Sequence, residues 1–218
     1  MKDFVIQHNT ITEAHYEMSA LEKNILYMLL AQLKDEYIPG YIYKISVKEL
    51  EAATGKKMNH VRFSNIIRKV VNKTLVIRGI DKRLITLNFL TSGEYDGRSS
   101  EIGLELSKEA QILFFSLKEN FTLFKTKIAL SLDSKYAKRL YEMLSQYKDT
   151  GVLILSIEEL KKRLGIIDSR TQKDKYPKHG LFRAKVLDTA KKELDEKGDI
   201  TFDYEARKTG RIFTDLVF

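Results

Sequence analysis

One ten-residue pattern occurs twice in the chain. LYMLLAQLKD runs from Leu26 to Asp35 and LYEMLSQYKD runs from Leu140 to Asp149, an offset of 114 residues. A second pair, SVKELEAATG at Ser46–Gly55 and SIEELKKRLG at Ser156–Gly165, keeps Ser, Glu, Leu and Gly in register at an offset of 110 residues. A period of this length is too long for a solenoid repeat. It predicts two homologous domains in tandem, which we place at residues 1–118 and 119–218.

Composition limits the classes of protein that these domains can form. A chain of 218 residues with 43% hydrophobic and 31% charged residues is typical of a soluble globular protein with a modest core in each half. The N-terminus, MKDFVIQHNT, lacks an apolar signal segment, and the apolar run Ile25–Ala31 is far too short to span a membrane. The absence of cysteine excludes disulfides and thiolate sites. We therefore expect a cytoplasmic protein without membrane contacts.

The net charge of +8 is concentrated in two stretches. Lys161–Lys192 holds eleven Lys and Arg against three Asp, and Lys56–Lys73 holds six Lys and Arg without an acid. A single charge run is usually a solvated face. Two runs at equivalent places in two repeats instead favour a surface that binds a polyanion.

Local signals predict where the helices begin and end. Ser-x-x-Glu before an apolar pattern is a capping box, and it occurs at Ser19, Ser46 and Ser156. Helices should therefore start at about residues 20, 47 and 157. The counterpart of the first helix should start near Ser134, and each second helix should end at a glycine, Gly55 or Gly165.

A third helix and a set of strands follow in each half. The third helices carry apolar stripes that begin at Phe63 and at Phe182. Alternating patterns predict strands at 75–77, 84–90, 101–106, 200–204 and 212–216, a loop at Thr91–Ser100, a helix at Ser107–Leu117 and a basic hairpin tip at Arg207–Arg211. The order helix, short strand, helix, helix, hairpin is that of a winged helix, so we expect an α+β fold of two tandem winged-helix domains related by internal duplication. A helix of this kind fits the major groove of B-DNA.

Three segments of the second half resemble a known family. They are Ser134–Leu144, Ser156–Gly165, and Phe182–Leu194 with the hairpin that contains Gly210-Arg211. The chain resembles the iteron-binding plasmid replication initiators, which have two winged-helix domains. The resemblance implies that the second domain reads a repeated sequence in the double-stranded plasmid origin. The first domain is then expected to contact the DNA backbone and to mediate homodimerisation.

The resemblance also implies a set of activities and partners. Family members commonly repress their own gene as dimers and initiate replication as monomers. They open the origin and recruit host replication proteins, here expected to be the host replicative helicase and the host initiator.

The DNA-binding candidates of the second domain lie on its third helix and on its hairpin: Lys178, His179, Arg183, Lys185, Lys192, Arg207, Lys208 and Arg211. Lys185 is exposed by its helical phase and should contact DNA. Arg183 lies nearer the apolar stripe, so base, phosphate and packing roles stay open. Lys178 and His179 are placed to contact phosphate at the helix start or to form a plain loop. The remaining candidates contact phosphates or minor groove, or only face solvent.

The first domain offers a parallel set. Lys56, Lys57, Arg62, Arg68 and Lys69 are candidate phosphate contacts, and Asn65 on the same face could read adenine, although a surface Asn is more common. The matched tyrosines Tyr27 and Tyr141 are interpreted as core or domain-interface residues.

Catalysis is not expected. The histidines His8, His15, His60 and His179 include no metal-binding pair, and the only Gly-Lys, Gly55-Lys56, lacks the surroundings of a phosphate-binding loop. No cofactor or metal is predicted. A transcriptional repressor unconnected to replication and a protein-interaction module remain as alternatives.

Overall fold

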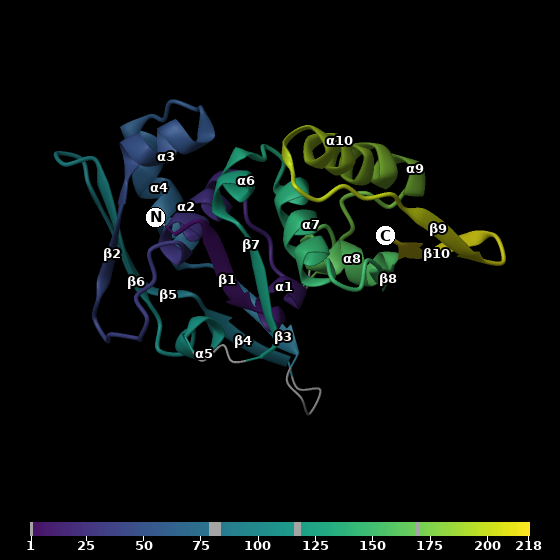
Figure 1. Ribbon diagram of the computed structural model, residues 1–218, viewed down its shortest axis with the longest axis horizontal. Helices are drawn as coiled ribbons and strands as arrows, with labels where there is room; N and C mark the ends of the chain where they lie inside the picture. The colour runs from purple at the N-terminus through teal and green to yellow at the C-terminus, as the bar shows by residue number, and fades with distance from the viewer. Residues whose placement is uncertain (1, 79–83, 116–118, 169–170) are drawn as a thin grey trace.

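Two three-stranded antiparallel sheets with the same strand order lie at opposite ends of the molecule (Figure 1). The first has the order β2 (Ile42–Ser46), β6 (Glu101–Leu106), β5 (Leu90–Asp96), and the second β8 (Ile154–Ser156), β10 (Ile212–Val217), β9 (Glu205–Thr209). β2, between α2 (Ala20–Leu30) and α3 (Val47–Thr54), pairs with β6, and β8, between α7 (Lys135–Gln146) and α8 (Ile157–Arg163), pairs with β10. In each sheet the strand between two equivalent helices therefore pairs with the last strand of its half. The predicted pair of winged-helix domains related by duplication is thereby confirmed.

The computed structural model describes residues 2–78, 84–115, 119–168 and 171–218, without the side chains of residues 60–62, 78, 84, 111 and 112. The helices are α1 (Asn9–Glu13), α2 (Ala20–Leu30), α3 (Val47–Thr54), α4 (His60–Val71), α5 (Gln111–Phe114), α6 (Thr126–Ser131), α7 (Lys135–Gln146), α8 (Ile157–Arg163), α9 (His179–Phe182), the π-helical turn η1 (Arg183–Leu187) and α10 (Asp188–Lys197). The other strands are β1 (Phe4–His8), β3 (Thr74–Arg78), β4 (Leu84–Asn88) and β7 (Phe121–Lys125).

The helix starts predicted from capping boxes are confirmed. The Ser19 hydroxyl accepts a hydrogen bond from the Glu22 backbone N–H, and the Ser19 N–H donates to the Glu22 carboxylate. Helices α2, α3, α7 and α8 begin directly after their capping serines. Gly55 ends α3 in the left-handed conformation at φ 67°, where glycine carries no steric cost.

The first strands of the two halves pair with each other. In the antiparallel pair β1–β7, Phe4 lies opposite Lys125, Ile6 opposite Leu123 and His8 opposite Phe121. Each strand leads into a short helix, α1 or α6. The register is centred on Ile6 and Leu123, which hold the same place in their repeats. Residues 121–131 thus repeat the strand–helix order of residues 4–13.

The segment Thr91–Ser100 was predicted as a loop, and this prediction was wrong for most of its length. Residues 90–96 form β5, which pairs with β6 to make the wing of the first domain. Gly93 is suited to the strand because a Cβ there would lie 2.7 Å from Val71 Cγ2 and 2.8 Å from Ile67 Cγ2. The glycine in this segment, which is typical of loops, is instead explained by the close packing of β5 on α4.

Two further predictions were displaced. Residues 200–204 do not form a strand, because the Phe202 carbonyl accepts a hydrogen bond from Lys191 Nζ at 2.6 Å and β9 begins only at Glu205. The helix expected at 107–117 is limited to α5, residues 111–114, and the end of the expected range lies outside the described residues. Strands β3 and β4 form a separate hairpin inserted before the wing.

Candidate nucleic-acid interface

Helices α9 and α10 and the π-helical turn η1 form one continuous helix over residues 179–197, which we call the 179–197 helix. Its buried face is made by Phe182, Val186, Ala190 and Leu194, all with no exposed area. In an α-helix each four-residue step drifts by roughly 40°, so three such steps would leave one face. The wider turn η1, where the Asp188 N–H donates to the Arg183 carbonyl, offsets this drift.

Outside this buried face, the 179–197 helix exposes the predicted residues Arg183, Lys185 and Lys192, and Lys178 is exposed at its N-cap. Lys192 Nζ lies 3.9 Å from Glu196 Oε1, a weak pairing. The Arg183 side chain is 61% exposed, so the role in helix packing that the sequence left open is excluded.

Arg183 has a partner that its sequence position does not suggest. Its Nε lies 3.6 Å from Asp188 Oδ2, and Asp188 Oδ1 accepts a hydrogen bond of 2.6 Å from the Tyr204 hydroxyl. The expected α-helical spacing would place residues 183 and 188 roughly 140° apart. This contact could be predicted only if the π-helical turn were already known.

His179 joins the 179–197 helix to the wing of the second domain. Its ring stacks on Phe213 with centroids 4.0 Å apart, and Lys208 Nζ lies 4.4 Å from the Phe213 ring centroid. Burial, followed by the positive charges of Arg183, Lys161 and Lys208, lowers the pKa of His179. The lowered pKa favours the neutral form of the ring, which stacks on the wing through Phe213. Sequence reasoning did not identify Phe213 as its partner.

The wing itself is basic at its tip. Arg207 and Lys208 lie on β9 and Arg211 follows the turn at Gly210, where φ is 64°; all three side chains are exposed. Lys191 differs from them, because in addition to Phe202 it contacts Asp195 and Asp203 at 3.2 Å. Lys191 thus fastens the segment before the wing to the helix.

Four of the six predicted residues of the first domain line a groove of about 700 Å³ between α4 and the α6–α7 connection. Its lining includes Lys56, Lys57, Asn65, Lys69 and, on the far side, Asp133. Lys56 Nζ lies 2.5 Å from Asp133 Oδ1. Asn65 is not a free amide, since its Oδ1 accepts a hydrogen bond of 3.3 Å from the exposed Arg68. The Arg62 side chain lies outside the described residues.

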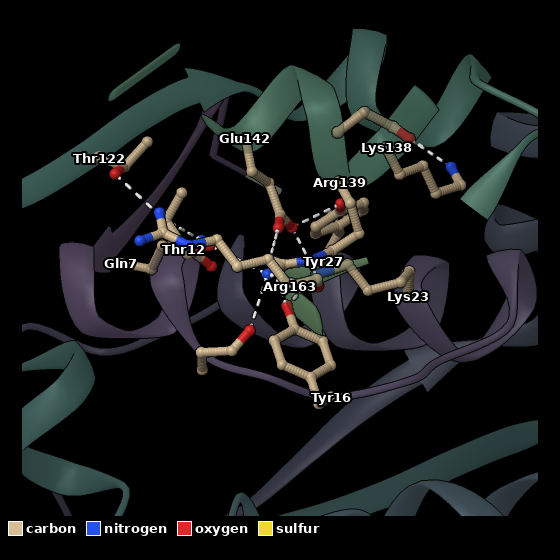
Figure 2. Close-up of polar contacts among 12 residues, drawn as sticks. Gln7, Thr12, Tyr16, Lys23, Tyr27, Thr122, Lys138, Arg139, Glu142 and Arg163 are labelled. Atoms are coloured by element: carbon tan, nitrogen blue, oxygen red, sulfur yellow. Dashed lines mark hydrogen bonds and ion pairs between the residues drawn. The ribbon is translucent and has the colours of Figure 1, made fainter. Parts of the chain in front are cut away.

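A buried charge cluster fixes the junction of the two halves (Figure 2). It consists of Tyr16, Lys23, Tyr27, Arg139 and Glu142, none more than 6% exposed. Glu142 on α7 pairs with Lys23 on α2 and with Arg139, and it accepts a 2.7 Å hydrogen bond from the Tyr27 hydroxyl. Tyr16 accepts hydrogen bonds from Lys23 at 2.7 Å and from Arg139 at 2.8 Å.

Burial and pairing act against each other in this cluster. Burial lowers the pKa of Lys23 to about 8. Burial alone would raise the pKa of Glu142, but Lys23 and Arg139 hold it below its usual value. A buried charge set is costly unless every member is paired. Because these pairs span α2 and α7, they hold the two domains in one orientation.

Among the described residues, no group of three or more His, Cys, Asp or Glu side chains could hold a metal ion. The same part of the chain has no helix with the length and hydrophobicity needed to cross a membrane.

Comparisons with known proteins identify the family of the chain. A family model described as "Initiator Replication protein, WH1" matches residues 4–145, and one described as "Initiator Rep protein, WH2" matches residues 156–218. The chain belongs to the initiator replication protein family. The resemblance that the sequence indicated is therefore confirmed, whereas the domain boundary at residues 118/119 stays a prediction.

Two relatives of this initiator protein are informative. It is 24% identical to the "PI protein" of Escherichia coli over an alignment that covers 97% of this chain and 82% of that protein. Its structure is similar to a crystal structure of the Pi initiator protein in complex with iteron DNA, with a TM-score of 0.80 and 20% identity, covering 99% of this chain and 96% of the other.

Proposed function

We propose that this initiator protein starts plasmid replication by binding repeated origin sequences, iterons, in double-stranded DNA. The observation that carries the proposal is the set of exposed basic side chains on the 179–197 helix and at its N-cap, Lys178, Arg183, Lys185 and Lys192, in a chain of the initiator replication protein family. A similar fold is recorded on iteron DNA in the Pi initiator protein.

The arrangement of the two halves supports binding along one duplex. In Figure 1, α3 and α4 lie at the upper left and α9 and α10 at the upper right, so these helices of the two halves lie toward one side of the molecule. Two such helices would contact major-groove segments about one helical turn apart, roughly 10 bp. The basic side chains would displace counterions from the phosphates.

Selection of bound duplexes from a random DNA library tests the proposal. We expect enrichment of one long, non-palindromic site with two parts. Enrichment of a palindrome alone would instead indicate a dimeric repressor, and no enrichment would indicate a protein-interaction module. Lys108→Ala is a control variant that should select the same site as the wild-type protein. Lys108 is exposed and precedes α5, which lies on the lower side of Figure 1.

The finer steps of the proposal follow the family resemblance. The protein represses its own gene as a homodimer in equilibrium with a monomer, and it opens the origin as a monomer. It recruits the host replicative helicase and the host initiator in the cytoplasm, and it acts by binding, without catalysis or a cofactor.

Each of these steps has a separate measurement. Sedimentation with and without the selected duplex reports the oligomeric state. Permanganate reactivity of unpaired thymines reports origin opening, and pull-down with purified host helicase reports recruitment. Bound protein that leaves the origin fully paired would contradict the opening step while leaving site-specific binding intact.

A further inference from the structure

The π-helical turn η1 changes which residues of the 179–197 helix can meet. It places Arg183 and Asp188, five residues apart, on the same face, with Arg183 Nε 3.6 Å from Asp188 Oδ2. In an α-helix these positions would be roughly 140° apart. π-Turns within α-helices occur frequently at functional sites, and this one lies in the middle of the basic helix.

Asp188 is itself held from outside the helix. The Tyr204 hydroxyl donates to Asp188 Oδ1 at 2.6 Å, leaving Oδ2 for the guanidinium. Tyr204 directly precedes β9, so its position depends on the wing. Burial, followed by the hydrogen bond to Asp188, raises the pKa of Tyr204, so the hydroxyl remains a donor at neutral pH. The three side chains form a chain of contacts, Tyr204–Asp188–Arg183.

Contact through Nε leaves the rest of the guanidinium available. The closest approach of Arg183 to Asp188 is through Nε, at 3.6 Å, and the Arg183 side chain is 61% exposed. An arginine that presents two N–H groups in a fixed plane matches O6 and N7 of guanine in the major groove. A carboxylate that fixes the orientation of this plane lowers the entropy lost when the base is bound.

We propose that Arg183 reads a guanine in the origin repeat and that Asp188 and Tyr204 are positioning residues that orient it through the π-helical turn. The inference rests on the proposed function and deepens it, because it assigns one base contact to one side chain. The exposed pair Arg183–Asp188 contributes little to stability. Substitutions here should therefore leave the fold intact.

The test measures binding of the selected duplex and of all its single base-pair variants. Wild-type protein should prefer guanine at one position by roughly 5- to 150-fold, the range of a bidentate contact. Arg183→Ala should abolish this preference, and Arg183→Lys should weaken it, since the lysine ammonium donates hydrogen bonds but lacks the planar pair of donors. Asp188→Asn and Tyr204→Phe should reduce the preference at that position alone, by about threefold or more.

A double substitution separates positioning from a general structural role. In the Arg183→Ala background, Asp188→Asn should change nothing further at that base pair. Glu196→Gln is the matched control, because Glu196 is an exposed acid on the same helix that lies 3.9 Å from Lys192. It should leave every base preference unchanged.

The inference is overturned if Asp188→Asn and Tyr204→Phe leave the guanine preference intact or weaken all positions equally. It is also overturned if Arg183→Ala retains the preference. Wild-type protein with no base preference anywhere would refute the proposed function itself, and this outcome is distinct from the other two.

Discussion

The Tyr27 hydroxyl donates a hydrogen bond of 2.7 Å to Glu142, and this contact joins α2 of the first half to α7 of the second. Both residues have no exposed area. Glu142 also neutralises Lys23 and Arg139, so a single carboxylate balances two cations at the domain junction. The stability of the domain junction therefore depends more on Glu142 than on any surface ion pair.

Glu142→Gln should lower the free energy of unfolding by about 3–5 kcal/mol, because it leaves Lys23 and Arg139 buried without their anion. Urea denaturation measures the change. Glu158→Gln is the control, since Glu158 is 68% exposed and pairs with Lys162 at 2.5 Å; its cost should stay below about 1 kcal/mol. Equal losses in both variants would contradict the central role of Glu142.

Lys138 should make stability depend on pH. Burial, followed by repulsion from Lys23, lowers its pKa from 10.5 to about 7 in the folded protein. Between these two values the unfolded chain binds more protons than the folded chain, so its contribution to stability rises with pH, at most by about 1.4 kcal/mol per unit. The slope of unfolding free energy between pH 7 and about pH 10 should be shallower in Lys138→Met.

Lys192→Met, which changes an exposed lysine, is the control for this slope and should follow the wild-type curve. Lys23, whose pKa is lowered to about 8, also makes the free energy of unfolding rise with pH. The Lys138→Met variant retains this contribution. Identical slopes for Lys138→Met and wild type would show that Lys138 carries no shifted proton.

Gly93→Ala should destabilise the first domain. The added Cβ would lie 2.7 Å from Val71 Cγ2 and 2.8 Å from Ile67 Cγ2 on α4, and overpacking of this kind costs about 1–3 kcal/mol. Gly97→Ala is matched, because its Cβ would meet only Tyr95 Cε1 at 3.8 Å. Thermal unfolding that ranks the two variants equally would refute the close packing of wing and helix.

Lys192→Ala should weaken binding to all duplexes by a similar factor. A phosphate contact carries no base information, so its loss reduces the slope of log affinity against log salt by about one. Titrations at several salt concentrations, with the selected duplex and with a scrambled duplex, measure both effects. A loss confined to the selected duplex would instead make Lys192 a base contact.

The helix starts could be predicted from the sequence because their causes are local. Ser19, Ser46 and Ser156 each cap the helix that begins one residue later, and a capping box involves only four consecutive residues. The duplication was also visible, since the matched helices retain their core spacing. Both signals are independent of how the halves pack.

The remaining features depend on tertiary contacts that no local pattern encodes. Gly93 suggested a loop, yet its lack of a side chain is what allows β5 to approach α4. At the candidate interface the exposure of Lys185 followed from its helical phase. The contact of Asp188 with Arg183 could not be predicted in this way, because it requires the π-helical turn. That turn offsets the angular drift that four-residue spacing produces along the buried face of the helix.

The pairing of β1 with β7 determines the order in which the protein can be completed during synthesis. Residues 4–8 leave the ribosome more than a hundred residues before their partner strand, residues 121–125. The N-terminal half therefore leaves the ribosome with one strand unmatched, and its final folding step waits for the beginning of the C-terminal half. The two DNA-binding domains should consequently mature and unfold as one cooperative unit, although each has its own sheet.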